Sequence, residues 1–328
     1  MIKKIGILAS GGNSPAMNNC IITIVKKCSS LNIESVLINE GFHGLLNENF
    51  TKPDVNFLSV FYDNGNVCIG TSRCPEFKEE KNQIKAYKIL KKHKIDCLFV
   101  IGGNGSYHGG YALTKLGMHV ICLPATIDND INSTEKTIGF STALNNIVTC
   151  IDSIKDSFDS HRGICLIEVM GRRFPDLAIN AGIACGVEGI ITSSNIMTAD
   201  DIVKLANETE KNGHRSCLIV VTEKIYGRDG LPTLNEIVAE VQKRTNRVSR
   251  ADVLGYIQRG GTTTSEDRIM GNLMGAFSVD LAQKDNKSYS VDFINGRIVG
   301  TNLEESINAP LKKEKIALLK DYFKYNKK

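Results

Sequence analysis

An acidic loop is the first place in this sequence where side chains have the types and spacing for chemistry. The segment VICLPATIDND, residues 120–130, ends an apolar run and then places Thr126, Asp128 and Asp130 close together. Two carboxylates two residues apart in an extended loop point to the same side. Such a pair can bind a cation, or one carboxylate can take a proton from a hydroxyl group that the other holds. The alternative is a solvated turn with local hydrogen bonds, but the buried strand before the loop favours a functional role.

Two glycine-rich turns resemble each other. IGILASGGN (residues 5–13) and LFVIGGNGS (residues 98–106) each lead from an apolar strand into Gly-Gly-Asn and then into a helix. Glycine leaves backbone amides open to a ligand, and a helix N-terminus adds partial positive charge. Two such turns on one sheet can cradle a polyphosphate, although neither the P-loop pattern nor the dinucleotide-binding fingerprint is present.

Arginines recur beside glycines further along the chain. Arg73 lies in IGTSRCPEF, Arg172 and Arg173 follow EVMG, and Arg259 precedes a pair of glycines. A guanidinium group offers paired donors to a phosphate, and neighbouring glycine lets that phosphate approach the backbone. Together with the acidic loop, these arginines predict a site for a phosphorylated substrate and a phosphoryl donor.

The elements that must position these residues alternate along the chain. Short apolar runs without polar alternation are typical of parallel strands buried on both faces, and amphipathic helical stretches separate them. The predicted strands are 4–9, 34–38, 95–101, 119–123, 163–169, 189–192 and 216–222, and the predicted helices include 17–28, 79–93 and 233–245. This pattern predicts an α/β fold with largely parallel sheets, in which ligands bind beyond the carboxyl ends of the strands.

Composition excludes several classes of protein. The 328 residues suggest two domains at about 100–200 residues each. A formal net charge of +4 is too mild for a nucleic-acid surface. No apolar run approaches the roughly 18 residues of a membrane span, and the first residues do not resemble a signal peptide. We therefore expect a soluble, cytoplasmic protein with no nucleic-acid or membrane partner.

The ten cysteines are expected to be reduced and structural. They form no C-x-x-C pair, which argues against a zinc site. Cys97, Cys122, Cys165 and Cys217 lie in apolar runs, where a thiol behaves as a small hydrophobe. The last segment, residues 311–328, is expected to form an amphipathic helix.

The chain as a whole resembles a known family, the bacterial ATP-dependent 6-phosphofructokinases. The matching segments appear in the family's order and spacing up to about residue 310: SGGNSPAMN, IGTSRCPEF, IGGNGSYHGG, LPATIDNDI, IGFSTALN, IEVMGR, VTE and VLGYIQRGG with a following DR. The resemblance implies transfer of the γ-phosphoryl group of ATP to the 1-hydroxyl of fructose 6-phosphate, with Mg²⁺. Lipid and NAD kinases also use a glycine turn of this kind, but the IEVMGR and IQRGG segments argue against them.

The resemblance also implies an organisation. Two three-layer α/β domains are expected: residues 1–139 with 252–302 as a larger nucleotide-binding domain, and residues 140–251 with 303–328 as a smaller sugar-phosphate-binding domain. The family is usually a homotetramer in which neighbouring subunits complete each sugar-phosphate site. The family's allosteric effector site is less well matched, because Ile22 falls where an arginine is common, while Lys26, Lys155 and Arg215 keep positive charge nearby.

Residue roles follow from the same resemblance, position by position. Asp128 would be the base, and Thr126, Arg73 and Arg172 would complete the catalytic set. The expected substrate-binding residues are Thr126, Asp128, Asp130, Met170, Gly171, Arg172, Glu223, Arg250, Tyr256 and Arg259. The expected nucleotide-binding residues are Gly12, Arg73, Cys74, Asn104, Gly105, Ser106 and Gly109, and Asn104 would face the metal. Gly105 and Ala125 are typical of members that use ATP rather than pyrophosphate.

The sequence departs from the family pattern at several ligand positions. Asn13 and Asn104 replace aspartates, Gly163 replaces a phosphate-binding arginine, and Tyr256 replaces a histidine. Arg162 or Arg173 is a candidate substitute for the missing arginine. Two interpretations stay open: a working but altered phosphofructokinase, or a weak or inactive subunit that binds sugar phosphate or nucleotide and pairs with an active paralogue in a hetero-oligomer. Asn104→Asp is expected to lower the demand for Mg²⁺, and the double change with Asn13→Asp is expected to exceed either single change.

Overall fold

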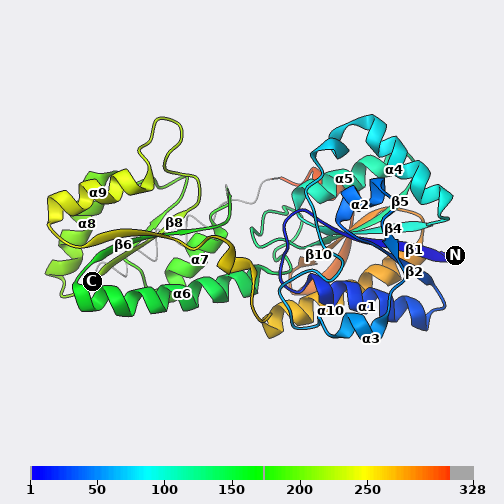
Figure 1. Cartoon of the computed structure of the whole chain (residues 1–328), viewed down its shortest axis with the longest axis horizontal. Helices are drawn as coiled ribbons and strands as arrows, with labels where there is room; N and C mark the ends of the chain where they lie inside the picture. The colour runs from blue at the N-terminus through cyan, green and yellow to red at the C-terminus, as the bar shows by residue number, and fades with distance from the viewer. Residues whose placement is uncertain (1, 173, 311–328) are drawn as a thin grey trace. The chain divides into compact units, whose positions relative to one another are not determined.

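The structure is a computed structural model that describes residues 2–172 and 174–310. It divides into two compact units (Figure 1). Among the described residues, unit 1 runs to Thr142 and resumes at Arg259, and unit 2 covers Ala143–Gln258. The predicted helix at residues 311–328 and the candidate Arg173 lie outside the described residues. The described helices include none that combines the length and the apolar character needed to cross a membrane.

Unit 1 is built on a seven-stranded sheet with the order β11-β10-β5-β4-β1-β2-β3. The pairs among β1, β2, β4, β5 and β10 are parallel, whereas β3 and β11 join the two edges antiparallel. The strands are β1 (Lys4–Ser10), β2 (Glu34–Ile38), β3 (Phe50–Thr51), β4 (Cys97–Gly102), β5 (His119–Pro124), β10 (Tyr289–Ile294) and β11 (Arg297–Asn302). The helices are α1 (Met17–Ser30), α2 (Gly41–Leu46), α3 (Val55–Ser59), η1 (Pro75–Lys78), α4 (Glu80–Lys92), α5 (Asn104–Thr114), α10 (Ser265–Lys284) and α11 (Leu303–Ile307).

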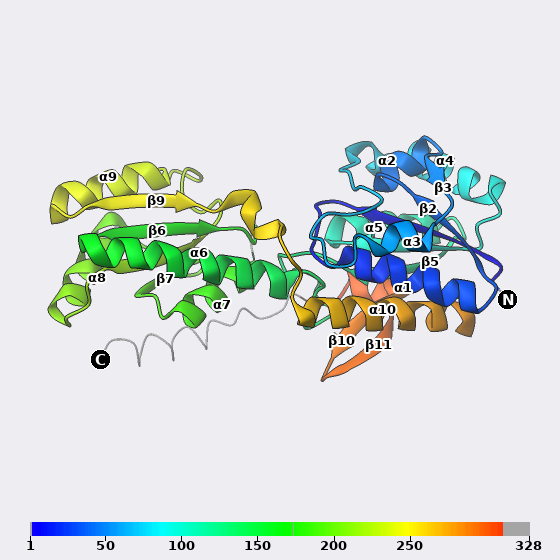
Figure 2. The ribbon, with the colours of Figure 1, turned by 60° about the horizontal axis from the view of Figure 1, so that its bottom comes forward.

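Helices cover both faces of this sheet, which explains the unbroken apolar runs of its strands. Successive side chains of a strand point to opposite faces, so Ile5 and Ile7 pack with α1 and α10, while Leu8 packs with α2, α4 and α5. Figure 1 shows the same division, with α1, α3 and α10 on one side and α2, α4 and α5 on the other, and Figure 2 turns the layer with α1 and α10 toward the viewer. Both layers depend on strands that are buried on both faces.

Unit 2 repeats the three-layer plan on a smaller scale. Its four strands lie in the order β7-β8-β6-β9 and all three pairs are parallel. The strands are β6 (Ile164–Val169), β7 (Gly189–Ile191), β8 (Cys217–Thr222) and β9 (Ser249–Val253). The helices are α6 (Phe140–His161), α7 (Asp176–Cys185), α8 (Ala199–Lys211), α9 (Leu234–Thr245) and the short η2 (Gly255–Arg259), and both α6 and η2 cross a unit boundary.

Local sequence signals fix several helix starts in these units. Thr198 and Thr233 each form a capping box, with Asp201 and Glu236 respectively, at the starts of α8 and α9. In each box the threonine hydroxyl accepts the N–H three residues later, while the carboxylate accepts the threonine N–H. The helices therefore begin at these residues and pack their apolar sides against the sheet.

The predicted α/β fold class is confirmed, and each of the seven predicted strands is present. The prediction that Cys97, Cys122, Cys165 and Cys217 lie in the core is also confirmed, because all four are fully buried. The sequence analysis did not identify β3, β9, β10 or β11. These strands lie at the edges of the sheets or next to an edge, where a strand need not be a continuous apolar run.

Candidate active site

Three strands of unit 1 end level with one another. Ser10 of β1 pairs with Gly102 of β4, and Gly102 pairs with Pro124 of β5. The two glycine turns and the acidic loop follow these strands directly, so parallel pairing brings all three motifs to the same edge of the sheet. This is the edge at which open α/β sheets bind ligands.

The two glycine turns are tied together by a buried hydroxyl group. Ser106, in the first turn of α5, donates a hydrogen bond from its Oγ to the carbonyl oxygen of Ser10, at 3.0 Å. A Cβ atom on Gly102 would lie 2.5 Å from that same carbonyl oxygen. Glycine at 102 is therefore required for the close approach of the two turns.

The start of α5 is open to solvent. Asn104 is its first residue, and both Asn104 and Gly105 are exposed. A Cβ atom on Gly105 would have no heavy atom within 4 Å. The first N–H groups of a helix lack partners within the helix and carry partial positive charge, so this end of α5 has both the space and the donors for a phosphate.

Gly109 has a structural explanation of its own. A Cβ atom at this position would lie 2.7 Å from the ring of Phe42 on α2. The residue is small because α5 packs closely on α2, and its predicted role in nucleotide binding stays a prediction.

The acidic loop is folded rather than solvated. Asp128 and Asp130 are only 3% and 8% exposed, although the loop lies at the end of the sheet. The Thr126 hydroxyl accepts the backbone N–H of Asp128 at 3.2 Å, and the Thr137 hydroxyl donates to the carbonyl of Thr126 at 2.6 Å. Thr126 also backs onto the second glycine turn, since a Cβ atom on Gly103 would lie 3.4 Å from its Cβ. The structure therefore holds the two carboxylates in place beside that turn.

The segment that carries Arg73 is fastened to the first glycine turn. The N–H of Gly11 donates to the carbonyl of Ser72 at 3.1 Å, and the Thr71 hydroxyl donates to the carbonyl of Gly11 at 3.0 Å. Arg73 itself is exposed. The next residue, Cys74, has a thiol whose pKa is raised to about 12 by burial and by Glu76, so it is a neutral neighbour and not a reactive thiolate.

Arg259 lies over the first glycine turn. Its Nη1 donates to the carbonyl oxygen of Asn13 at 2.8 Å, and a Cβ atom on Gly12 would lie 2.6 Å from that nitrogen. Glycine at 12 thus makes room for this guanidinium.

The amide of Asn13 donates to the carbonyl oxygens of Gly65 and Arg259, each at 3.4 Å. An aspartate at 13 would face those two carbonyls, so these contacts argue against a gain from aspartate at this position.

In unit 2, the predicted sugar-phosphate residues cluster at the carboxyl ends of β6 and β8. Val169 and Thr222 end these strands in register, so Met170 and Glu223 follow at the same edge. Arg172 takes a left-handed backbone with φ of 55°, and its N–H donates to Oε1 of Glu223 at 2.9 Å. Gly171 has φ of 132°, and a Cβ atom there would lie 2.5 Å from the carbonyl oxygen of Phe174. The turn is strained, and Glu223 helps to hold it.

Arg250 and Tyr256 lie along the β9 edge of unit 2. Nη1 of Arg250 donates to Oε1 of Gln242 at 3.2 Å and to the carbonyl of Ser249 at 3.0 Å. Tyr256 is 79% exposed. Both side chains reach solvent, where a ligand can contact them, and their roles stay predictions.

Position 163 is closed to a side chain. A Cβ atom on Gly163 would lie 2.5 Å from the ring of Phe158 and 3.0 Å from the carbonyl oxygen of Val248. Nε of Arg247 donates to the carbonyl of Arg162 at 2.8 Å. A one-residue slip that brought Arg162 into this place would break these contacts, so the packing opposes that substitution.

The sequence analysis gave no role to Gln258, which is fully buried and whose side-chain oxygen accepts the N–H of Met170 at 3.0 Å. The sequence offered one indirect signal, because Gln258 lies in the same IQRGG segment as Arg259. A glutamine between two functional residues gives no indication of burial until the fold is known.

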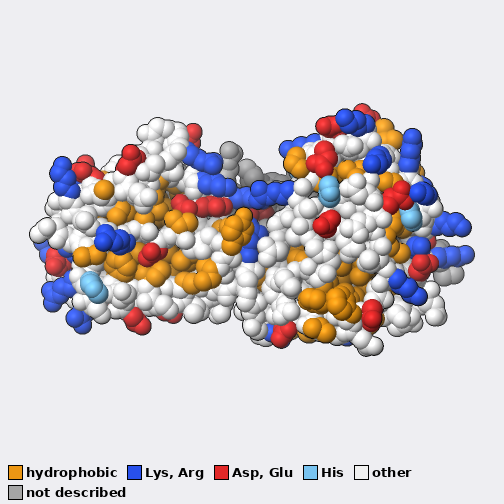
Figure 3. Space-filling view, in the orientation of Figure 1, with side chains coloured by type: hydrophobic (Ala, Val, Ile, Leu, Met, Phe, Trp, Pro, Cys, Tyr) orange, Lys and Arg blue, Asp and Glu red, His pale blue; other side chains and the backbone are white. Residues whose placement is uncertain are grey.

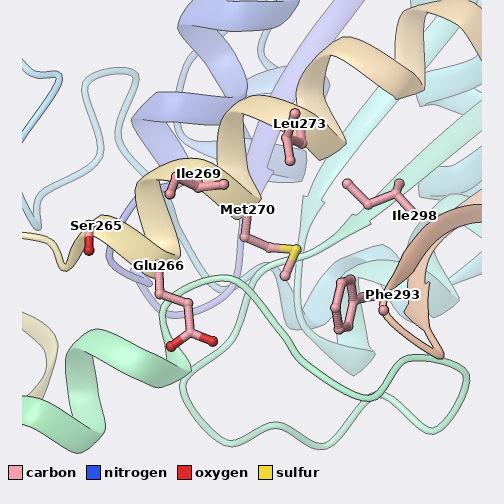
Figure 4. A pocket seen from close by; sticks show the side chains of 8 residues that line it. Ser265, Glu266, Ile269, Met270, Leu273, Phe293 and Ile298 are labelled. Atoms are coloured by element: carbon pink, nitrogen blue, oxygen red, sulfur yellow. The ribbon is translucent and has the colours of Figure 1, made fainter.

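A separate apolar pocket lies between α10 and the β10–β11 hairpin. Figure 4 shows Met270 and Phe293 in it, with Glu266 at one end. The pocket has a volume of about 480 Å³ and is lined by none of the predicted site residues. Oε1 of Glu266 pairs with Lys136 at 2.5 Å. The pocket therefore differs in place and chemistry from the candidate active site.

Residues 2–172 and 174–310 contain no group of three or more histidine, cysteine, aspartate or glutamate side chains arranged to hold a metal. A dedicated protein cage for a cation is thus absent from the described part of the chain. A magnesium ion that is held mostly by phosphate oxygens and water needs only one or two protein ligands, and the edge that carries Asn104 and the acidic loop fits that kind of site.

Comparison with known proteins agrees with this geometry. Residues 4–282 match the family model described as phosphofructokinase. The chain is 40% identical to an ATP-dependent 6-phosphofructokinase of Mesomycoplasma hyopneumoniae over 95% of its own length and 96% of that protein. It is also 40% identical to the enzyme of the same name from Listeria innocua, over 93% of each chain.

Solved structures show the same fold. The phosphofructokinase of Saccharomyces cerevisiae superposes with a TM-score of 0.84 at 27% identity, and the match covers 93% of this chain and 45% of that longer one. A pyrophosphate-dependent phosphofructokinase of Nitrosospira multiformis matches with a TM-score of 0.85 at 19% identity, over 99% and 91% of the two chains, a similarity that speaks for the fold alone. By its sequence over most of its length, this chain belongs to the phosphofructokinase family.

Proposed function

We propose that this chain transfers the γ-phosphoryl group of ATP to the 1-hydroxyl group of fructose 6-phosphate, which yields fructose 1,6-bisphosphate and ADP. The observation that carries the proposal is the level ending of β1, β4 and β5, which brings the two glycine turns and a buried acidic loop to one edge. The names of the relatives describe the same reaction. This reaction is a step of glycolysis.

Asp128 is the proposed base. The bond between the γ-phosphorus and its bridging oxygen breaks, a new bond forms to O1 of the sugar, and the hydroxyl proton passes to the Asp128 carboxylate. The Thr126 hydroxyl accepts the Asp128 N–H, so the base sits on a loop with a fixed backbone, as general-base catalysis requires. Thr126 and Asp130 contact the substrate beside it.

The nucleotide is proposed to lie along the two glycine turns. The exposed start of α5, with Asn104 and Gly105, supplies backbone donors to its phosphates, and the buried Ser106 supports this turn from behind. Gly12, Cys74 and Gly109 line the same site, and Arg73 contacts the phosphoryl group during transfer. The open space at Gly105 suits a nucleotide, so we expect pyrophosphate to be a poor donor.

Magnesium accompanies ATP in this proposal. When bound, it neutralises charge on the β- and γ-phosphates. Asn104 is the residue of this chain proposed to face it, through its side-chain oxygen. An amide oxygen ligates a hard cation without contributing charge, so this chain is expected to hold magnesium less tightly than an aspartate at 104 would.

The sugar phosphate is proposed to bind to unit 2 residues Met170, Gly171, Arg172 and Glu223, with Tyr256, and to Arg259. In the homotetramer that we propose, Arg250 of a neighbouring subunit completes the site. Exposed apolar side chains support assembly: Phe57 and Val60 on or beside α3 are 58% and 69% exposed, and Figure 3 shows hydrophobic side chains gathered over α1, α3 and α10. Surfaces of this kind are often buried between subunits.

A second candidate is a weak or inactive subunit that pairs with an active paralogue. The closed position 163 favours it, because Phe158 and Val248 leave no room for an arginine that would bind the sugar phosphate. The buried acidic loop favours the working enzyme. We place the working enzyme in the cytoplasm, where glycolysis supplies its substrates.

One experiment separates the two candidates. The purified chain is assayed for fructose 1,6-bisphosphate with ATP, magnesium and millimolar fructose 6-phosphate, while its mass is measured in the same buffer. Product from a homo-oligomer supports the enzyme. A folded oligomer that binds fructose 6-phosphate and makes no product supports the inactive subunit, and faster turnover with pyrophosphate than with ATP would overturn the choice of donor.

A further inference from the structure

Gln258 joins two backbone segments of unit 2 through its side chain. It is fully buried. Its Oε1 accepts the N–H of Met170 at 3.0 Å, and its Nε2 donates to the carbonyl oxygen of Gly255 at 2.9 Å. One amide group therefore links the turn after β6 to the start of η2.

The two segments depend on this link for different reasons. Met170 is the first residue after β6, so its N–H lies beyond the strand ladder that ends at Val169. Gly255 begins η2 with a left-handed φ of 54°, a conformation that leaves its carbonyl outside a regular strand. Gln258 therefore adds a hydrogen-bond partner to one backbone group in each segment.

The backbone of Gln258 is anchored to helix α6. Nδ2 of Asn146 on α6 donates to the carbonyl oxygen of Gln258 at 3.3 Å. The side chain thus extends from a backbone that is anchored to α6, and it reaches both segments without contact with solvent. A residue in this position cannot touch a ligand, so it acts only through its neighbours.

We propose that Gln258 is a positioning residue that fixes the Met170–Arg172 turn against the segment that carries Tyr256. The inference rests on the proposed function, in which these two segments bind the sugar phosphate. Both bonds run from one rigid amide plane, so the separation of the two segments is set by the geometry of a single side chain. Loss of the link weakens sugar-phosphate binding and leaves nucleotide binding unchanged, because the glycine turns belong to unit 1.

The decisive variant is Gln258→Glu. A protonated carboxyl group reproduces both bonds, since its carbonyl oxygen accepts from Met170 and its hydroxyl donates to Gly255. The ionised form accepts from Met170 but faces the Gly255 carbonyl with negative charge. Burial raises the pKa of a carboxyl group above its ordinary value of about 4.3, so we expect the variant to change form within the range in which the protein can be assayed.

The measurement is the dissociation constant for fructose 6-phosphate, taken by calorimetry without ATP between about pH 6 and about pH 9. The quantity compared is the ratio of the dissociation constants of variant and wild type at each pH, because the sugar phosphate and the neighbouring carboxyl groups of the site are common to both proteins. We expect a ratio within about threefold of one at low pH that rises to on the order of tenfold at high pH, as one charged contact becomes repulsive. A ratio that does not change with pH overturns the inference.

Gln258→Leu removes both bonds at all pH values and supplies the second arm. We expect a dissociation constant for fructose 6-phosphate raised on the order of tenfold, with the KM for ATP within about twofold of wild type. The matched control is Asn18→Leu, because Asn18 is a fully buried amide of unit 1 that donates to Phe61 and Asn66 and accepts from Cys68. It should lower the melting temperature and leave sugar-phosphate binding unchanged.

The outcomes are distinct. Equal loss of sugar-phosphate and ATP affinity in Gln258→Leu, or an equal effect of Asn18→Leu on sugar-phosphate binding, shows a purely structural role and overturns the inference. If Gln258→Leu does not fold, the pH series of Gln258→Glu decides alone. A wild-type chain that neither binds nor phosphorylates fructose 6-phosphate overturns the proposed function, and the inference with it.

Discussion

Ser106 Oγ donates a buried hydrogen bond to the carbonyl oxygen of Ser10 across 3.0 Å, and so joins the start of α5 to the end of β1. The two residues are 96 positions apart in the sequence. Their bond links the two glycine turns on which the nucleotide is proposed to lie, and it reinforces the β1–β4 pairing that brings those turns together.

The first prediction concerns that bond. Ser106→Ala is expected to raise the KM for ATP about fivefold, because one hydrogen bond contributes roughly 1 kcal/mol, with little change in the KM for fructose 6-phosphate. Steady-state kinetics with each substrate varied in turn provide the measurement. Ser278→Ala is the control, since Ser278 is also buried and donates to a carbonyl, that of Gly275 within α10. An equal rise in the ATP KM for both variants would show that the effect is one of stability.

The second prediction concerns the proposed base. Asp128→Asn should lower turnover by a factor of about 10² to 10⁴ and leave the dissociation constant for fructose 6-phosphate within about tenfold of wild type. The amide preserves the shape of the side chain but cannot accept the hydroxyl proton. Single-turnover assays and calorimetry test the two halves separately. More than a tenth of wild-type turnover would remove Asp128 from this role.

The third prediction separates the two asparagines. Asn104 lies exposed at the start of α5, so Asn104→Asp should add charge near the cation and lower the magnesium concentration for half-maximal rate by on the order of tenfold. Asn13 instead donates to the carbonyls of Gly65 and Arg259, so Asn13→Asp should lose two donors and bring no gain. Magnesium titrations of the initial rate at fixed ATP compare the variants with wild type. Superimposable curves for Asn104→Asp and wild type would place residue 104 away from the metal.

The fourth prediction concerns position 163. Gly163→Arg should destabilise the fold by roughly 1–3 kcal/mol, the usual range for overpacking, because even its Cβ would lie 2.5 Å from the ring of Phe158. It should not improve sugar-phosphate binding by itself. Thermal melts of Gly163→Arg, Phe158→Ala and the double variant form a double-mutant cycle. Additive losses in the double variant would mean that Phe158 is not the obstacle.

The fifth prediction concerns pH. Burial, and then the charge of Glu223, raise the pKa of Glu168 above its ordinary value of 4.5. The folded state therefore binds this proton more tightly than the unfolded state, and the stability that the group contributes is lost as pH rises through the raised folded pKa. The glutamine of Glu168→Gln cannot ionise. The melting temperature of this variant, relative to that of wild type, should therefore increase as pH rises from about 5 to about 8.

Glu236→Gln provides the control for that series. The pKa of Glu236 is lowered by hydrogen bonds from the backbone N–H and the hydroxyl of Thr233. Its contribution to stability is fully present above its ordinary pKa of 4.5 and is lost only as pH falls through the lowered folded pKa, so the difference in melting temperature between this variant and wild type should stay nearly constant across the range. Parallel trends for the two variants would contradict the assignment of Glu168.

The sequence alone determined the fold class and the motifs that carry the chemistry. Strands buried on both faces read as unbroken apolar runs because both faces need apolar side chains, and this is why the residue pattern alone located β1, β4 and β5. The glycine turns and the Thr126–Asp130 loop could also be recognised from the sequence, because their chemistry depends on neighbours within a few residues. The edge strand β11 and its neighbour β10 did not show such a run, since an antiparallel hairpin beside the sheet edge carries a weaker apolar pattern.

Only the tertiary structure decided which distant residues meet. The fit of Gly109 against Phe42, the carbonyl of Val248 against position 163, and the guanidinium of Arg259 over Gly12 all join segments that share no local pattern. Gln258 is the clearest example. The sequence suggests an exposed glutamine beside Arg259, whereas in the fold this side chain is buried and its amide bonds to Met170 and Gly255. Such roles depend on burial and on hydrogen-bond geometry across the fold, and neither quantity is contained in the local order of the residues.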